Sequence, residues 1–443
     1  MKSKGAIIGL RIKSKQSFMQ KFYESNKDFI KKQAIFGVVF SFTKATVYLV
    51  PLLLADVLSS KDFGVLEYAL AGLGMVVNTV INLGVPGAYP YFLLKEKRLD
   101  IQTSFKLHSI ILLVPLIINQ ILFFCFQLNI NFYLAFNVSF IIANQVFYST
   151  QLKSHEKSLW AVILDSGIYL VLLLLFVLSF SGFVKININV ISYFILFYAL
   201  VYAVYAIYTF IKYRALIDFN KYKAILKFSI HLLISTFLIF LITTSGRILV
   251  EFFFDFNTVG IYAFYFRLAA VVVMIYQIIN ITFFKKIYTL NPNILDKYYC
   301  MFFVLIYTLS VFIFFVSPFV VKYFSNYFNE TFVLNQGTYF LLSAQMVMWI
   351  ASALNSSIID REKLASKNNI KFLILIILSV VVLYFLRDIM HLQTLVLVHF
   401  TVITMACLIQ YFSLYQKKIK FKKSIVSLLA IYAVSICVFI FII

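Results

Sequence analysis

Charged residues are scarce in this 443-residue sequence: they make up 13% of the chain, against about 25% in soluble globular proteins. Acidic residues are the scarcest of them, with 17 Asp and Glu against 39 Lys and Arg. Hydrophobic residues reach 63%. This composition excludes a soluble domain, and it assigns the basic excess to membrane topology rather than to a nucleic-acid partner. The sequence predicts an integral membrane protein.

Cysteine and histidine are also few, and neither forms a cluster. Each cysteine lies alone within an apolar run, and the histidines are spread over five segments, without CxxC or HxxxD spacing. We therefore predict no catalytic residue, no metal site and no cofactor. The residues concerned are Cys125, Cys300, Cys407, Cys437, His108, His155, His231, His391 and His399.

Long apolar runs predict thirteen transmembrane helices in an all-α polytopic fold. Of the 39 Lys and Arg, 32 fall in the segments on one side of these runs and 4 in the loops on the other side. The positive-inside rule then places the N-terminus in the cytosol and the C-terminus outside. The predicted spans are 33–55, 63–83, 105–127, 130–151, 159–181, 190–211, 228–250, 259–284, 299–321, 336–358, 370–386, 391–415 and 424–443.

The spans group into two halves joined by a basic connector. Residues 1–32 form a basic cytoplasmic segment, 33–211 an N-terminal six-helix bundle, and 212–227 the cytoplasmic connector. Residues 228–415 form a C-terminal six-helix bundle, and 424–443 an additional helix. We expect the two bundles to be related by a pseudo-twofold axis.

A short repeat supports this division. Gly64 follows the first predicted external loop, Gly260 follows the fourth, and the two lie 196 residues apart. In each copy an aromatic or β-branched residue precedes the glycine and an aliphatic residue follows it. Six spans separate the copies, so both have the same orientation in the membrane, as in transporters built from parallel repeats.

Five segments carry a resemblance to a known family. Pro51–Leu54, Lys61–Gly64, Asn82–Ala88, Ser245–Arg247 and Val259–Ala263 resemble polysaccharide-export and O-antigen flippases of the multidrug/oligosaccharidyl-lipid/polysaccharide superfamily. The resemblance implies two six-helix bundles around a central cavity. It further implies alternating access that moves an undecaprenyl diphosphate-linked oligosaccharide across the bacterial cytoplasmic membrane, for O-antigen, capsule or related surface polysaccharides.

The resemblance covers about residues 33–415 and also bears on partners. It implies contact with the lipid bilayer and with other polysaccharide-assembly membrane proteins, and function as a monomer. One departure is Gly246, where many relatives have aspartate. Two alternatives remain open: a multidrug or small-molecule exporter of the same superfamily, and a membrane-embedded polysaccharide polymerase or acyltransferase.

Ionisable residues inside the predicted spans are candidate site residues, because a charge at mid-membrane costs at least ~2.5 kcal/mol. Lys44 lies at the centre of span 1, and Arg247 and Arg267 lie in spans 7 and 8. We predict that they bind substrate, since cations complement a diphosphate. Asn144 and Gln145 in span 4 are weaker candidates, because polar residues in membranes also hold helices together.

The carboxylates leave alternatives open. Asp165 in span 5 is either a coupling carboxylate or an ion-pair partner of Lys44. Arg247 has Glu251 four residues further on, which is the spacing of a helical ion pair. Glu67 is expected at the membrane interface, near the outer end of span 2.

Overall fold

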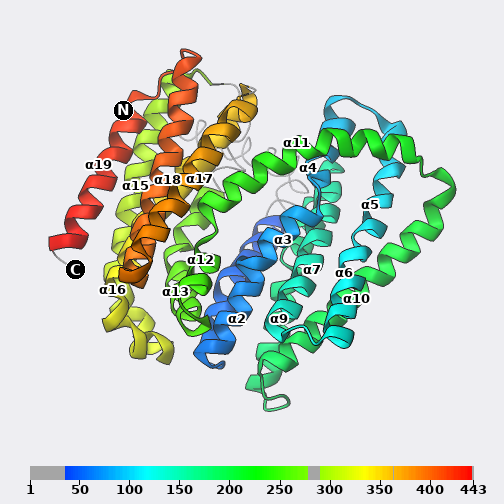
Figure 1. The fold of residues 1–443 in the computed structure, drawn as a ribbon, viewed down its shortest axis with the longest axis horizontal. Coiled ribbons are helices and arrows are strands. Elements are labelled where there is room, and N and C mark those ends of the chain that lie inside the picture. The colour runs from blue at the N-terminus through cyan, green and yellow to red at the C-terminus, as the bar shows by residue number, and fades with distance from the viewer. Residues whose placement is uncertain (1–34, 278–289, 363, 442–443) are drawn as a thin grey trace, which may run out of the picture.

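The structure is a computed structural model that describes residues 35–277, 290–362 and 364–441. Within these ranges every regular element is a helix (Figure 1). The predicted segment 1–32 and the end of the eighth predicted span lie outside them. The first helix covers Ile35–Ala55. It is followed by α2 (Ser60–Ala71), α3 (Leu73–Ile81), α4 (Val85–Pro90), α5 (Lys106–Ile111), α6 (Leu113–Phe126), α7 (Ile130–Ser154), α8 (Ser158–Asp165), α9 (Gly167–Phe180), α10 (Ile188–Tyr213), α11 (Phe219–Thr243), α12 (Gly246–Phe253), α13 (Phe256–Ala269), α15 (Pro292–Val320), α16 (Asn326–Arg361), α17 (Ala365–Leu386), α18 (Leu392–Gln416) and α19 (Lys422–Phe441).

The helices confirm an all-α polytopic membrane protein. In the described ranges, eleven helices are long and apolar enough to cross a membrane, and two bent pairs raise the number of spans to as many as thirteen. The bent pairs are α8 with α9, and α13 with Val271–Gln277. One predicted span, 228–250, was wrong in its continuity: α11 ends at Thr243, and α12 begins at Gly246 after a turn.

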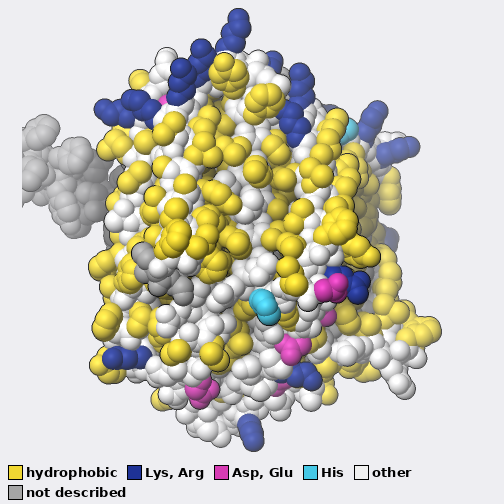
Figure 2. Space-filling view, turned by 60° about the vertical axis from the view of Figure 1, so that its left-hand side comes forward, with side chains coloured by type: hydrophobic (Ala, Val, Ile, Leu, Met, Phe, Trp, Pro, Cys, Tyr) yellow, Lys and Arg dark blue, Asp and Glu magenta, His cyan; other side chains and the backbone are white. Residues whose placement is uncertain are grey.

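Charge is concentrated at one end of the molecule. Figure 2 shows Lys and Arg side chains gathered at the upper end, a belt of hydrophobic side chains below them, and few cations at the lower end. This separation of charge agrees with the alternation of basic and non-basic loops along the sequence. We refer to this upper end as the basic end.

The repeat seen in the sequence extends to the caps of two helices. Ser59 caps α2 by accepting a hydrogen bond from the N–H of Asp62, and Asp255 caps α13 by accepting one from the N–H of Thr258. The capping residues Ser59 and Asp255 are 196 positions apart, and so are the residues whose N–H groups they accept from, Asp62 and Thr258. Side-chain caps of this kind fix where a helix begins, so the repeated turn sets corresponding starts for α2 and α13.

The same interval relates the two most buried single-helix spans among the described residues. Helix α7 begins at Ile130 and α16 at Asn326, 196 positions later. Helix α7 packs against α2, α3, α4, α6, α8 and α10, whereas α16 packs against α13, α15, α18 and α19. Each helix is thus the centre of its own group of neighbours.

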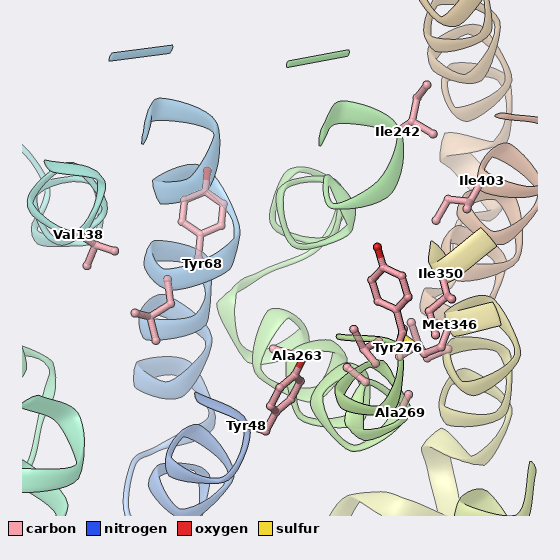
Figure 3. Packing of buried hydrophobic residues seen from close by; sticks show 14 of the residues in the cluster. Tyr48, Tyr68, Val138, Ile242, Ala263, Ala269, Tyr276, Met346, Ile350 and Ile403 are labelled. Atoms are coloured by element: carbon pink, nitrogen blue, oxygen red, sulfur yellow. The ribbon is translucent and has the colours of Figure 1, made fainter. Parts of the chain in front are cut away.

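One continuous hydrophobic core joins the two groups. In Figure 3 buried side chains follow one another from Val138 on α7, across α2 and α13, to Met346 and Ile350 on α16 and Ile403 on α18. Helices α2 and α13 make the most extensive helix–helix contact in the described structure. This pair therefore forms the main contact between the two groups.

A buried carboxylate fixes the thirteenth span. Asp296 on α15 accepts hydrogen bonds from the N–H groups of Lys423 and Ser424, at 3.0 and 2.8 Å, and from the Ser424 hydroxyl at 2.7 Å. These donors belong to the first turn of α19, where N–H groups have no partner within the helix. Asp296 thereby docks α19 on α15.

Replacing Asp296 with alanine is expected to lower the free energy of unfolding by about 2 kcal/mol, because buried first-turn donors lose their acceptor. Thermal unfolding of the purified variant in detergent measures this loss. Asp388→Ala is the matched control, since the Asp388 side chain is 87% exposed. Equal unfolding temperatures for the two variants would show that Asp296 does not hold α19.

Candidate functional site

A buried carboxylate between two arginines is the central feature of the α2–α13 contact. Glu67 on α2 is 0% exposed. Arg247 on α12 approaches its Oε2 atom, with Nη2 at 3.0 Å and Nε donating at 3.1 Å. Arg267 on α13 donates from Nε to the other oxygen, Oε1. We call these three residues the ion cluster.

The ion cluster is fixed by neighbours from several helices. Arg267 donates from Nη1 to the carbonyl oxygen of Val47 in the first helix at 2.9 Å, and its guanidinium lies 5.7 Å from the centre of the Tyr169 ring on α9. Arg247 lies 4.7 Å from the centre of the Phe266 ring. Two cations share one carboxylate, so the cluster keeps an excess positive charge in an apolar region, which is costly and marks a functional site by default.

A reciprocal contact of two glycines lies beside the cluster. A Cβ atom on Gly64 would overlap the carbonyl oxygen of Phe256, and one on Gly260 would lie 2.5 Å from the carbonyl oxygen of Ser60. Each oxygen belongs to the residue four positions before the opposing glycine. Exchanging the two repeats therefore reproduces the contact, as in a twofold interface. We call this contact the glycine crossing.

A third contact ties the same region to α16. Asp56, after the first helix, accepts hydrogen bonds from the hydroxyl of Ser325 at 3.0 Å and from the N–H of Tyr327 at 2.8 Å. The Tyr327 ring packs against Phe63 and Phe264. The ion cluster, the glycine crossing and this contact together form what we call the α2–α13 seam. Helix α2 begins at the lower end of Figure 1, opposite the basic end of Figure 2.

The structure brings together only some of the residues that the sequence singled out. It unites Arg247 and Arg267, and it adds Glu67 as their shared partner. One expectation was wrong: Arg247 pairs with Glu67 rather than with Glu251. Glu251 lies beside the hydroxyl of Tyr68 instead. Glu67 itself is buried within the protein.

Lys44 and Asp165 lie apart from the ion cluster. Lys44 is half-buried, with its Nζ 5.9 Å from the centre of the Phe40 ring, and within electrostatic range of Asp165 and Lys153. Asp165 forms an ion pair with Lys153, whose side chain is 51% exposed. Lys44 therefore lies near Asp165, as predicted, but the direct ion pair of Asp165 is with Lys153.

Replacing Asp165 with asparagine is expected to change the free energy of unfolding by less than about 1 kcal/mol, because partly exposed ion pairs contribute little. Thermal unfolding in detergent measures the stability. A fall of several kcal/mol would show a buried structural pair instead.

Asn144 and Gln145 are both buried within α7. Asn144 donates to the carbonyl oxygen of Phe140 in its own helix at 2.9 Å, and Gln145 donates to the hydroxyl of Tyr198 on α10 at 3.4 Å. Gln145 therefore links two helices, as polar residues in membranes often do. Neither residue lies in the ion cluster.

A cavity of about 830 Å³ lies among α4, α5, α7, α8 and α10. Helices α4 and α5 lie toward the upper end in Figure 1, which is the basic end of Figure 2. We call this cavity the tyrosine pocket. Two lysines line it, and none of its described lining residues is a carboxylate. The lining residues are Tyr89, Gln102, Lys106, Tyr148, Gln151, Leu152, His155, Lys157, Leu164, Tyr198, Val201, Tyr202 and Tyr205.

No site was predicted at these aromatic residues, although their spacing carried a signal. Tyr198, Tyr202 and Tyr205 recur at intervals of four and three residues, which places them on one face of a helix. Tyr148 and Gln151 repeat the pattern on the fourth span. Both of these helix faces line the pocket.

Comparison of the chain with protein-family models, with curated proteins and with solved structures finds no match.

Proposed function

We propose that this protein is a transporter that moves an isoprenoid diphosphate-linked oligosaccharide across the bacterial cytoplasmic membrane by alternating access. The observation that carries the proposal is the α2–α13 seam, where repeat-related helices meet through a reciprocal glycine contact and a buried ion cluster. Parallel structural repeats that meet around a site are a common transporter architecture. The sequence resemblance to polysaccharide-export flippases supports the same class.

In this proposal, residues 33–211 and 228–415 move against each other as two bundles around a central cavity. The basic end faces the cytosol, in accordance with the positive-inside rule. The α2–α13 seam lies at the opposite end, so the described conformation is closed toward the outside. For the protein to open outward, Glu67 must break its ion pair with at least one arginine, and α2 and α13 must separate at the glycine crossing.

The cations favour an anionic cargo over cationic drugs. Arg247 and Arg267 outnumber Glu67, and each guanidinium offers a fork of donors that matches phosphate oxygens. When the seam opens, the freed arginines become donors for a diphosphate, which would compensate for the loss of the carboxylate. Lys44, three residues before Val47 in the first helix, contributes a further positive charge to the path.

The proposal is tested by extracting lipid-linked oligosaccharides from cells that lack the protein. A membrane-impermeant glycan probe on spheroplasts then reports which leaflet holds them. We expect complete repeat units to accumulate on the inner leaflet, hidden from the probe, because assembly continues while translocation stops. Accumulation on the outer leaflet would place the missing step after translocation and favour a polymerase.

A further inference from the structure

We infer that the tyrosine pocket is a binding site for a phosphorylated sugar, through which the glycan end of the cargo is first held at the basic end. The inference deepens the proposed function and rests on it for the link between this sugar and the transported lipid. Nothing in the ion cluster takes part, since none of its three residues lines the pocket. The pocket therefore adds a second site to the proposed transport path.

The clearest sign of a ligand is an unpartnered amide. Gln151 is 7% exposed, and its Oε1 atom accepts a hydrogen bond from the Lys106 ammonium at 3.1 Å. Its Nε2 atom is buried and has no hydrogen-bond partner. A buried donor left unpaired costs about 1–3 kcal/mol. The Gln151 side chain lines the pocket, so turning its amide group toward the cavity would let a ligand oxygen satisfy this donor.

Charge in the pocket selects an anion. Lys106 and Lys157 both line the pocket, and its described lining residues include no carboxylate. Lys106 is half-buried, where an ammonium interacts more strongly with an anion than at a hydrated surface. Together with the Gln151 amide, these groups offer donors to a phosphate.

The remaining lining residues suit a hydroxyl-rich ring. Tyr89, Gln102 and His155 form a polar group, with the Tyr89 hydroxyl 3.1 Å and the Gln102 Nε2 atom 3.1 Å from His155 Nε2. The hydroxyls of Tyr198 and Tyr202 lie 3.1 Å apart. Tyrosine combines a flat apolar ring with a polar tip, and small-molecule sites are typically cavities of about 300–1,000 Å³ with few convergent polar groups. The cavity therefore has room for a sugar and its phosphate.

Two sources supply this chemistry: the head group of a glycolipid and a soluble sugar phosphate. Calorimetric titration of the purified protein in detergent separates them, with farnesyl diphosphate-linked N-acetylglucosamine and glucose 1-phosphate as probes. Binding of the farnesyl probe alone supports the site and assigns it to a lipid head group. Binding of both supports the site and assigns it to the phosphorylated sugar. Binding of neither overturns the inference.

Variants locate the binding. Lys106→Gln combined with Gln151→Leu is expected to weaken probe binding at least tenfold, whereas Lys106→Arg keeps the charge and retains binding. Lys212→Gln is the matched control, because Lys212 is an exposed lysine on α10 outside the lining. Unchanged affinity in the double variant, or an equal loss in Lys212→Gln, would overturn the assignment to this pocket.

These experiments distinguish a failure of the pocket assignment from a failure of the proposed transport. Unfolding temperatures within a few degrees of the wild type show that each variant is folded. One outcome would refute the transport step but retain the pocket. In it, the purified protein binds the farnesyl probe through Lys106 and Gln151, whereas lipid-linked oligosaccharides still reach the outer leaflet in cells that lack the protein. If the protein does not bind the probe, but export of the lipid-linked oligosaccharide still requires the protein in cells, only the pocket assignment is refuted.

Discussion

Replacing Glu67 with glutamine is expected to lower the free energy of unfolding by about 3–5 kcal/mol, the typical loss when one partner of a buried ion pair is removed. Arg247 and Arg267 both direct donors at this carboxylate, which is 0% exposed. The variant leaves two buried cations without a counter-charge. The loss is measured as a lowered unfolding temperature in detergent.

The control is Glu251→Gln, since Glu251 is only partly buried and lies on the same helix as Arg247. We expect that variant to unfold close to the wild type. A double variant, Glu67→Gln with Arg267→Gln, removes one cation together with the anion and should lose less stability than the two single changes added together. Strict additivity would mean that the two side chains do not interact.

The second large effect is expected at the glycine crossing. Gly64→Val places a branched side chain where even a Cβ would overlap the carbonyl oxygen of Phe256. Helices α2 and α13 must then separate, which costs about 1–3 kcal/mol or more by the measure of overpacked cores. In the proposed cycle the variant cannot close outward, and glycan export is lost. Unfolding temperature and surface glycan together measure the effect.

Gly37→Val provides the comparison for this prediction. A Cβ at Gly37 in the first helix meets no atom of the described residues within 4 Å, so we expect normal export and nearly normal stability. Gly260→Val should behave like Gly64→Val, because the crossing is reciprocal. Normal export in Gly64→Val would show that close approach of α2 and α13 is dispensable for transport.

The sequence predicted the membrane spans well because their signals are local. Apolar length marks each span, and the alternation of Lys and Arg between loops checks the count. The repeat at Gly64 and Gly260 was also visible, because the cap and the glycine lie within a few residues of each other. The break between Thr243 and Gly246 was missed, since its residues lie in an otherwise continuous apolar run.

The partners of the buried charges were not predictable by the same means. Glu67 meets arginines 180 and 200 positions later in the chain, and only the crossing of α2 and α13 sets those distances. Sequence spacing favoured Glu251 for Arg247, because it reports neighbours within one helix. The unpaired Nε2 atom of Gln151 was not predictable for the same reason, because it depends on how the helices meet around the tyrosine pocket.

The most direct test of the proposed transport uses vesicles reconstituted with the purified protein and a fluorescent isoprenoid diphosphate-linked glycan. A membrane-impermeant reductant quenches only the outer-leaflet fluorophore. We predict that the wild type makes nearly all of the fluorophore accessible, whereas Gly64→Val vesicles leave about half protected, as protein-free vesicles do. Equal protection in wild-type and protein-free vesicles would contradict translocation by this protein.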